Sequence, residues 1–310
     1  MIVAFNGKVT EANHAVVSVS DHGFLYGMGL FETFRTYGGE PFLLERHFDR
    51  LQAGCEQLGM MWSRPTREKA QELIDRMLAA LGCHDAYIRW SVSAGEAPLG
   101  LPAEPYYEKA SEIVYMKPLP AIPEGLYERG RPLQQLKLAR AGSELGGTAP
   151  RLKSFHYMNS ILGKRELANY SWAKGAEGLF LNHEGFLSEG LVSNLFFMKN
   201  GVLKTPDVCT GALPGITRAK VLELAGELGI ATEIGLFRWE DLLEADEAFM
   251  TNSVQELVPV SMLFDTEGTR TDLPSVADAV TARLLEGYRS QAHKSERGDE
   301  PSSWTIIEPI

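Results

Sequence analysis

The sequence has 310 residues, of which 44% are hydrophobic and 23% are charged, so it can fold into one large domain or two ordinary ones and is too apolar for a disordered chain. Its formal net charge of -11 and the lack of a long lysine and arginine run exclude the basic surface that nucleic-acid binding needs. No stretch approaches the roughly 20 apolar residues of a membrane-spanning helix.

Three cysteines lie far apart in the chain, at Cys55, Cys83 and Cys209, without the paired spacing of a zinc site or a disulfide framework. This usage favours a reducing compartment. The N-terminus interrupts its short apolar runs at Asn6 and Glu11, unlike a signal peptide. We therefore expect a cytoplasmic protein with no metal site and with neither nucleic acid nor a membrane as a partner.

The first part of the chain alternates strand and helix patterns and predicts an α+β domain. In the segment 44–59 the apolar residues recur at intervals of four, three, four and three, as on one face of a helix. Asn6-Gly7 and Gly38-Gly39 mark hairpin turns. The predicted elements are strands in IVAFNGKV (2–9), AVVSVS (15–20) and LFETFRTYGGEPFLL (30–44), helices at 44–59 and 66–81, and a strand in AYIRWSVSAG (86–95).

The stretch KPLPAIPEG, residues 117–125, holds three prolines and predicts a linker, because proline interrupts both helices and sheet ladders. We place a small N-terminal domain at residues 1–118, the linker at 119–124, a larger C-terminal domain at 125–290, and a tail at 291–310 whose first half is loose. The elements predicted after the linker are a strand in LQQLKLAR (133–140), a glycine-rich loop (141–150), a helix reaching about Trp172, hairpins at 178–190 and 193–206, a helix within 211–230, and two strands within 245–260.

Several familiar motifs are absent, among them the phosphate loop G-x-x-x-x-G-K-[ST], the zinc motif H-E-x-x-H and the nucleophile elbow G-x-S-x-G. One feature does suggest an anion site. Gly215, Ile216 and Thr217 open a predicted helix, whose free backbone N–H groups can hold a phosphate. Thr217 fits a routine N-cap equally well, so this feature alone leaves both interpretations open.

Five segments, in order, resemble the motif series of fold-type IV pyridoxal-phosphate enzymes, the class IV aminotransferase family. The resemblance runs from about residue 3 to residue 285, and the group includes branched-chain and D-amino-acid aminotransferases and 4-amino-4-deoxychorismate lyase. It implies an α+β fold of two domains, the small one α/β and the larger one β-barrel-like, with pyridoxal 5'-phosphate as cofactor, a small-molecule substrate and a homodimer. The segments are SVSDHGFLYGMGLFETFRTYGGEPFLLERHFDRL, RLKSFHYMN, EGLFLNHEGFLSEGLVSNLFFMKNGVLKTP, TGALPGITR and MTNSVQELVPV.

The resemblance implies roles for three charged residues. Lys153 matches the lysine that forms an aldimine with the cofactor aldehyde, which requires a pKa below the usual value of about 10.4. Glu189 matches the carboxylate that keeps the pyridine nitrogen protonated. Arg50 matches the arginine that grips the phosphate with its fork of donors. Taken singly, each also fits an ordinary solvated charge, although a lysine at a helix start opposes the helix dipole.

Further residues match contacts to the same cofactor. The backbone amides of Ile216 and Thr217 and the hydroxyl of Ser253 match the rest of the phosphate clamp. Tyr157 matches a tyrosine whose hydroxyl faces the phenolic oxygen of the cofactor. His47 and Asn194 we interpret as structural.

The substrate pocket has to discriminate among members of the group, because their first steps are shared. For the substrate carboxylates we expect Arg89 first and Arg35 second, although strand arginines most often face solvent. Phe31 lies where D-amino-acid aminotransferases carry a tyrosine, which counts against that member.

The segment TNSVQE, with Asn252 and Ser253, resembles lyases more than aminotransferases. We therefore predict a lyase that forms 4-aminobenzoate and pyruvate for folate synthesis, with Lys153 removing the proton. A branched-chain or D-amino-acid aminotransferase and a non-catalytic cofactor-binding protein are the alternatives.

Overall fold

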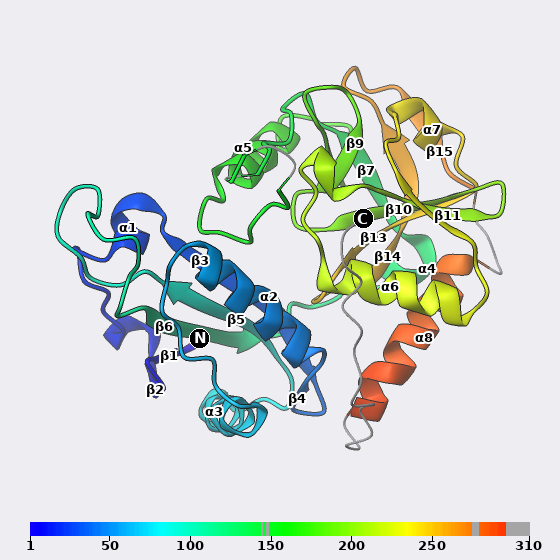
Figure 1. Cartoon of the computed structure of the whole chain (residues 1–310). Coiled ribbons are helices and arrows are strands. Elements are labelled where there is room, and N and C mark those ends of the chain that lie inside the picture. The colour runs from blue at the N-terminus through cyan, green and yellow to red at the C-terminus, as the bar shows by residue number, and fades with distance from the viewer. Residues whose placement is uncertain (144, 147–148, 275–278, 296–310) are drawn as a thin grey trace.

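The computed structural model describes residues 1–143, 145–146, 149–274 and 279–295. The strands of this part of the chain form two sheets, one from the first 118 residues and the other from residue 131 onward. They build two domains that lie side by side, the N-terminal one blue to teal and the C-terminal one green to orange-red (Figure 1). The predicted α+β fold with two domains is confirmed.

The N-terminal domain contains a six-stranded antiparallel sheet with the order β2-β1-β6-β5-β3-β4. Both predicted hairpin turns are present, and Asn6, Gly7, Gly38 and Gly39 all have the positive φ that tight hairpin turns require. Strand β6 was not predicted. The strands are β1 (Ile2–Phe5), β2 (Lys8–Glu11), β3 (Gly29–Tyr37), β4 (Glu40–Pro41), β5 (Ala86–Ser93) and β6 (Ser111–Pro118).

The strand predicted at residues 15–20 is wrong. This segment is an irregular loop between the 3-10 helix η1 (Ala12–His14) and the short helix α1 (His22–Tyr26). The side chains of Val16 and Val19 are exposed. The apolar run therefore contributes surface and not part of the sheet.

Two helices pack against this sheet, α2 (Leu44–Gln57) and α3 (Arg67–Leu81). The predicted apolar stripe of α2 is buried against the strands. Thr66 caps the start of α3 by accepting a hydrogen bond from the backbone of Lys69, and Gly82 ends it with a φ of 70°. Both predicted helices are present, and these caps stabilise the ends of α3.

The C-terminal domain is a closed barrel with additional strands. Strands β10, β13, β14, β7, β8 and β9 follow one another around the ring, and the pair Asn194 and Glu189 joins β10 back to β9. The predicted β-barrel-like domain is confirmed. Its strands are β7 (Arg131–Gln135), β8 (Glu177–Leu181), β9 (Leu187–Gly190), β10 (Asn194–Lys199), β11 (Val202–Pro206), β12 (Thr232–Gly235), β13 (Glu247–Asn252), β14 (Glu256–Phe264) and β15 (Arg270–Asp272).

Helices flank the barrel, and one apolar cluster connects the two domains. Tyr37, Phe42 and Leu43, from the end of β3 to the start of α2, pack with Leu257 and Tyr288 of the C-terminal domain. This contact fixes the start of α2 relative to the barrel. The helices are α4 (Leu126–Arg129), α5 (Met158–Leu167), η2 (Val208–Thr210), α6 (Ile216–Glu227), α7 (Trp239–Leu243) and α8 (Val280–Ser295).

The predicted linker before the C-terminal domain and the predicted tail after it can be compared with the structure. Strand β6 ends at Pro118 and α4 begins at Leu126, and the segment between them contains neither helix nor strand. At the other end, α8 continues to Ser295, so the prediction that the tail is loose from residue 291 is wrong for residues 291–295, and the rest of the tail lies outside the described residues. None of the helices in the described ranges has the length and apolar content needed to cross a membrane.

Candidate active site

A cavity of about 300 Å³ is lined by residues of both domains. It brings together elements that are far apart in sequence: β3, β5, the segment before α5, the loop before α6, and the turn between β13 and β14. Nine of the ten residues predicted for the site line this cavity. They are Phe31, Arg50, Arg89, Lys153, Tyr157, Glu189, Ile216, Thr217 and Ser253.

The backbone around Lys153 is held against the N-terminal sheet. The N–H of Phe31 donates to the carbonyl of Lys153 (2.9 Å), and the N–H of Phe155 donates to the carbonyl of Gly29 (2.9 Å). The lysine segment thus pairs with the edge of β3, and α5 begins five residues after Lys153. The Lys153 ammonium lies 4.8 Å from the centroid of the Phe31 ring.

The surroundings of Lys153 favour its neutral amine. Burial, followed by the positive charge of Arg50, lowers the pKa of Lys153 from 10.5 to about 8, although Glu32 opposes this shift. Arg151 lowers the pKa further, and Glu189 raises it. A neutral amine is the form that attacks a carbonyl group.

Arg50 is fixed by a buried carboxylate that the sequence analysis did not identify. Its Nε and Nη2 each donate to Glu32 at 2.7 Å, and its Nη1 donates to the carbonyl of Pro214 (2.6 Å). His47 contacts the same carboxylate through Nδ1 (2.7 Å). Burial alone would raise the pKa of Glu32, but Arg50 and His47 outweigh it and lower the pKa from 4.5 to about 2. Glu32 is therefore an anion that orients Arg50 across the domain boundary.

Glu189 is a second buried carboxylate, at the end of β9. Its Oε1 lies 2.9 Å from Nη1 of Arg151 and 3.1 Å from Nε of Arg140, and its Oε2 accepts a hydrogen bond from the N–H of Leu213 (2.9 Å). Burial raises the pKa of Glu189 in spite of Arg151. A carboxylate with a raised pKa is a strong acceptor for a protonated ring nitrogen.

The N-terminus of α6 lies at the cavity and carries two hydroxyl groups beside it. Gly215 precedes the helix without a side-chain cap, so the first backbone N–H groups of α6 are free of that partner. The hydroxyls of Thr217 and Ser253 are 3.1 Å apart. A Cβ at Gly215 would collide with Oδ1 of Asn194, so only glycine fits this approach. Together these donors form an anion seat.

The part of the cavity lining around Phe31 is aromatic and cationic. The Arg89 guanidinium lies 3.5 Å from the centroid of the Phe31 ring, and burial lowers the pKa of Arg89. In the described part of the chain no carboxylate lies within 4.0 Å of Arg89. Burial and Glu189 raise the pKa of Tyr157 to about 12, so its hydroxyl is a proton donor at neutral pH.

The structure does not bring Arg35 to this cavity. Arg35 lies two residues beyond Thr33 on β3, where the strand leaves the cavity wall, and its Nη1 is 3.9 Å from the buried carboxylate of Glu256. The position of Arg35 therefore does not support the substrate role predicted for it. Lys117 and Arg151 line the cavity but were not predicted; for Arg151 its place two residues before Lys153 was the available signal.

The comparisons with known proteins agree with this geometry. A family model described as amino-transferase class IV matches residues 29–263. The chain belongs to the class IV amino-transferase family. The aminodeoxychorismate lyase of Bacillus subtilis is 36% identical over 264 residues, covering 84% of this chain and 86% of that protein. A putative branched-chain-amino-acid aminotransferase of Methanocaldococcus jannaschii is 35% identical over 289 residues, covering 93% and 96%.

Solved structures of both kinds of class IV enzyme superpose on the chain. The 4-amino-4-deoxychorismate lyase of Pseudomonas aeruginosa gives a TM-score of 0.77 at 30% identity, covering 93% of this chain and 98% of that one. The T.th. branched-chain amino acid aminotransferase with pyridoxamine 5'-phosphate gives 0.79 at 28% identity, covering 94% and 93%. The chain is thus a pyridoxal-phosphate-dependent class IV enzyme.

The residues of the cavity fit that cofactor. Nη1 of Arg151 and Nε of Arg140 are buried in ion pairs with Oε1 of Glu189 but form no well-aligned hydrogen bond within the described residues. The N-terminus of α6, with Thr217 and Ser253, suits a phosphate dianion, and Glu189 suits a ring nitrogen. Lys153, in the lining of the same cavity, supplies the amine that an aldehyde requires.

Proposed function

We propose that this protein is an aminodeoxychorismate lyase, which converts 4-amino-4-deoxychorismate to 4-aminobenzoate and pyruvate in folate synthesis. The observation that carries the proposal is the cationic part of the cavity lining, next to Phe31 and the cofactor residues Lys153 and Tyr157. Arg89 has no carboxylate partner within the described residues, and Lys117 lines the same cavity. The substrate carries two carboxylates, which such a lining accommodates. The Bacillus subtilis relative and the Asn252-Ser253 pair support the same reaction.

Different residues of the chain bind the cofactor and transfer the proton in this reaction. We assign the phosphate of the cofactor to Arg50, Ser253, Thr217 and the backbone of Ile216. When bound, pyridoxal phosphate supplies an electron sink for the carbon that bears the amine. The neutral amine of Lys153 removes the proton from that carbon, and the ring becomes aromatic as the neighbouring carbon–oxygen bond to the enolpyruvyl group breaks. Return of a proton to the departing enolpyruvate gives pyruvate.

Direct turnover tests this reaction. The purified protein receives enzymatically made 4-amino-4-deoxychorismate, and both 4-aminobenzoate and pyruvate are followed with time. Equal amounts of the two products are expected from the wild type, at a rate at least about a hundredfold higher than from Lys153→Ala. The absence of both products at micromolar enzyme would refute the proposal.

A class IV aminotransferase, of branched-chain or D-amino-acid type, is the second candidate, because the Methanocaldococcus jannaschii relative has that name. It predicts that a simple amino acid alone bleaches the cofactor absorbance and releases a keto acid. Phe31 at the cavity counts against the D-amino-acid type. A non-catalytic cofactor-binding protein, the third candidate, would be yellow and inert in both assays.

We also propose that the enzyme is a cytoplasmic homodimer. All three cysteines are free, which fits a reducing compartment. Large apolar side chains are exposed on the N-terminal domain at Val16, Val19 and Phe24 and on α5 at Met158 and Ile161. We assign these side chains to the contact between the two subunits. Sedimentation should give twice the 34.3 kDa of the chain, and Ile161→Asp should lower that mass.

A further inference from the structure

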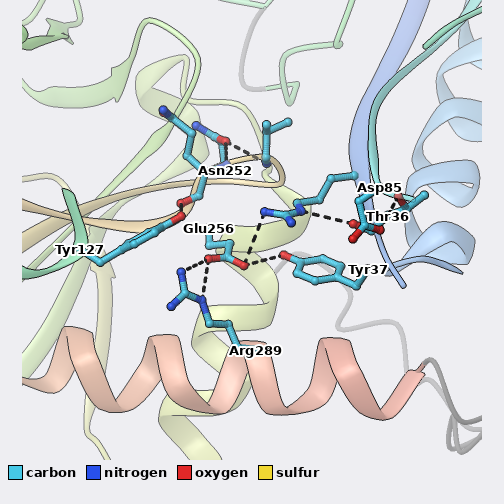
Figure 2. A network of polar contacts seen from close by, with 10 residues as sticks. Thr36, Tyr37, Asp85, Tyr127, Asn252, Glu256 and Arg289 are labelled. Atoms are coloured by element: carbon cyan, nitrogen blue, oxygen red, sulfur yellow. Dashed lines mark hydrogen bonds and ion pairs between the residues drawn. The ribbon is translucent and has the colours of Figure 1, made fainter. Parts of the chain in front are cut away.

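The carboxylate of Glu256 lies at the centre of a polar network that connects four elements (Figure 2). The hydroxyl of Tyr37, at the end of β3, donates to Oε1 of Glu256 (2.9 Å). Nε and Nη2 of Arg289, on α8, both donate to Oε2, at 2.8 and 2.6 Å. The side chain of Glu256 is 3% exposed, so hydrogen bonds from Tyr37 and Arg289, and not from water, stabilise its carboxylate.

The backbone at Glu256 is in a conformation that a side chain disfavours. Its φ is 61°, in the left-handed region that glycine adopts more readily. Glu256 is the first residue of β14 and pairs with Asn252, the last residue of β13. The carboxylate contacts stabilise a residue that turn geometry alone would assign to glycine.

The turn that ends at Glu256 is a wall of the active-site cavity. Residues 251–255 all line it. Inside the turn, Oδ1 of Asn252 accepts hydrogen bonds from the N–H groups of Val254 (3.0 Å) and Gln255 (2.8 Å). Outside it, the hydroxyl of Tyr127 donates to the carbonyl of Gln255 (3.2 Å). Ser253, whose hydroxyl lies 3.1 Å from that of Thr217, therefore belongs to a turn that Tyr127 stabilises from outside.

The same network reaches the N-terminal domain. Tyr37 belongs to the apolar cluster shared by the two domains, and the guanidinium of Arg35 lies over its ring at 4.4 Å. The neighbouring Thr36 donates to Asp85 (2.9 Å), and the N–H of Gly39 donates to the same oxygen (3.1 Å). The end of β3 is thus rigidly held where it meets Glu256.

We infer that Glu256 is a positioning residue for phosphate binding: it locks the 252–255 turn against Tyr37 and Arg289 so that Ser253 and Thr217 face the phosphate together. The inference rests on the proposed phosphate role of Ser253 and Thr217. It makes the phosphate seat dependent on the contact between the domains, since Tyr37 comes from one and Ser253 from the other.

Comparing two forms of the cofactor separates this role from a general structural one. Pyridoxal has the aldehyde and the ring nitrogen but no phosphate, so its binding depends on Lys153 and not on the turn. Glu256→Gly removes the carboxylate at a φ that glycine adopts without strain. We expect Glu256→Gly to raise the Kd for pyridoxal 5'-phosphate by about tenfold or more, the loss of one good hydrogen bond, and to leave the Kd for pyridoxal within about twofold.

Three further variants keep the test decisive. Glu256→Gln and Tyr37→Phe change single contacts and should shift the ratio of the two Kd values in the same direction, by less. Glu247→Gln is the matched control, because Glu247 is equally a buried carboxylate and accepts hydrogen bonds from Val280 and Thr281 at the other end of β13. Its ratio should equal that of the wild type.

Two results would overturn the inference. One is an equal loss of affinity for both compounds in the folded Glu256 variants, and the other is no loss for either. A shifted ratio in Glu247→Gln would count against it as well. Turnover plays no part in this measurement, so a failure to form 4-aminobenzoate would refute the proposed reaction and leave the role of Glu256 standing.

Discussion

The pKa of Lys153 sets how much of its amine is free to react, and it can be measured directly. Burial, and then Arg50, lower this pKa from 10.5 to about 8. With a pKa of about 8, roughly one amine in ten is neutral at pH 7, against about one in 3,000 for a pKa of 10.5. The site thus makes the reactive form about 300-fold more abundant.

Two substitutions should move this pKa in opposite directions. Arg151→Gln removes a cation that lowers the pKa of Lys153, so the pKa should rise by about one unit. Glu189→Gln removes an anion that raises it, so the pKa should fall by a similar amount. A change of the same sign in both variants would indicate altered burial instead of altered charge.

Competitive labelling of the cofactor-free protein provides the assay. A trace of acetic anhydride is added between pH 6 and pH 11, and the labelled peptide that contains Lys153 is quantified by mass spectrometry. Exposed Lys174 gives the internal reference for reagent reactivity. The wild-type curve should have its midpoint near pH 8, because the neutral amine is the nucleophile. A midpoint above pH 10 would refute the electrostatic account of the site.

The other predictions concern single residues. Lys153→Ala should fold, lose covalently bound cofactor and lose turnover by at least about a hundredfold, as steady-state kinetics and absorbance would show. Glu32→Gln should cost about 3 kcal/mol of stability at pH 7 by leaving the partly buried Arg50 without its carboxylate partner. Because the pKa of Glu32 is lowered to about 2, its contribution is present above pH 4.5 and lost as the pH falls toward 2, so thermal unfolding of the variant should depend less on acid in that range. Arg89→Gln should raise the substrate KM by about tenfold or more, while Arg35→Gln leaves it unchanged.

Local patterns predicted those parts of the fold that local interactions determine. The apolar stripe of α2 and the hairpin turns at Asn6-Gly7 and Gly38-Gly39 both follow from neighbours within a few residues. The segment 15–20 was wrongly predicted as a strand and strand β6 was not predicted, because local patterns do not determine which segments join a sheet. Strand propensity depends on which neighbours pack beside it, and the partners of β6 are β1 and β5, distant in sequence.

Arg89 and Arg35, the two arginines predicted to bind the substrate, show that contacts distant in sequence also determine the site. Arg89 lines the cavity and Arg35 does not. Alternation along β3 places Phe31, Thr33 and Arg35 on one face, but the cavity ends after Thr33. Two residues along a strand are about 7 Å, enough to carry Arg35 out of the cavity and to Glu256. The face of a strand on which a residue lies can be predicted from the sequence. The extent of a cavity cannot, because it depends on where the second domain makes contact.

The charges around Lys153 explain why one site can favour both a neutral amine and an anionic ligand. Two buried carboxylates flank the lysine, Glu32 from the N-terminal sheet and Glu189 from the barrel, and the arginines paired with them are Arg50, Arg140 and Arg151. Three guanidinium groups against two carboxylates leave one positive charge in excess before Lys153 is counted. This excess disfavours protonation of Lys153 and attracts a phosphate dianion, so a single arrangement activates the nucleophile and recruits the ligand that it reacts with.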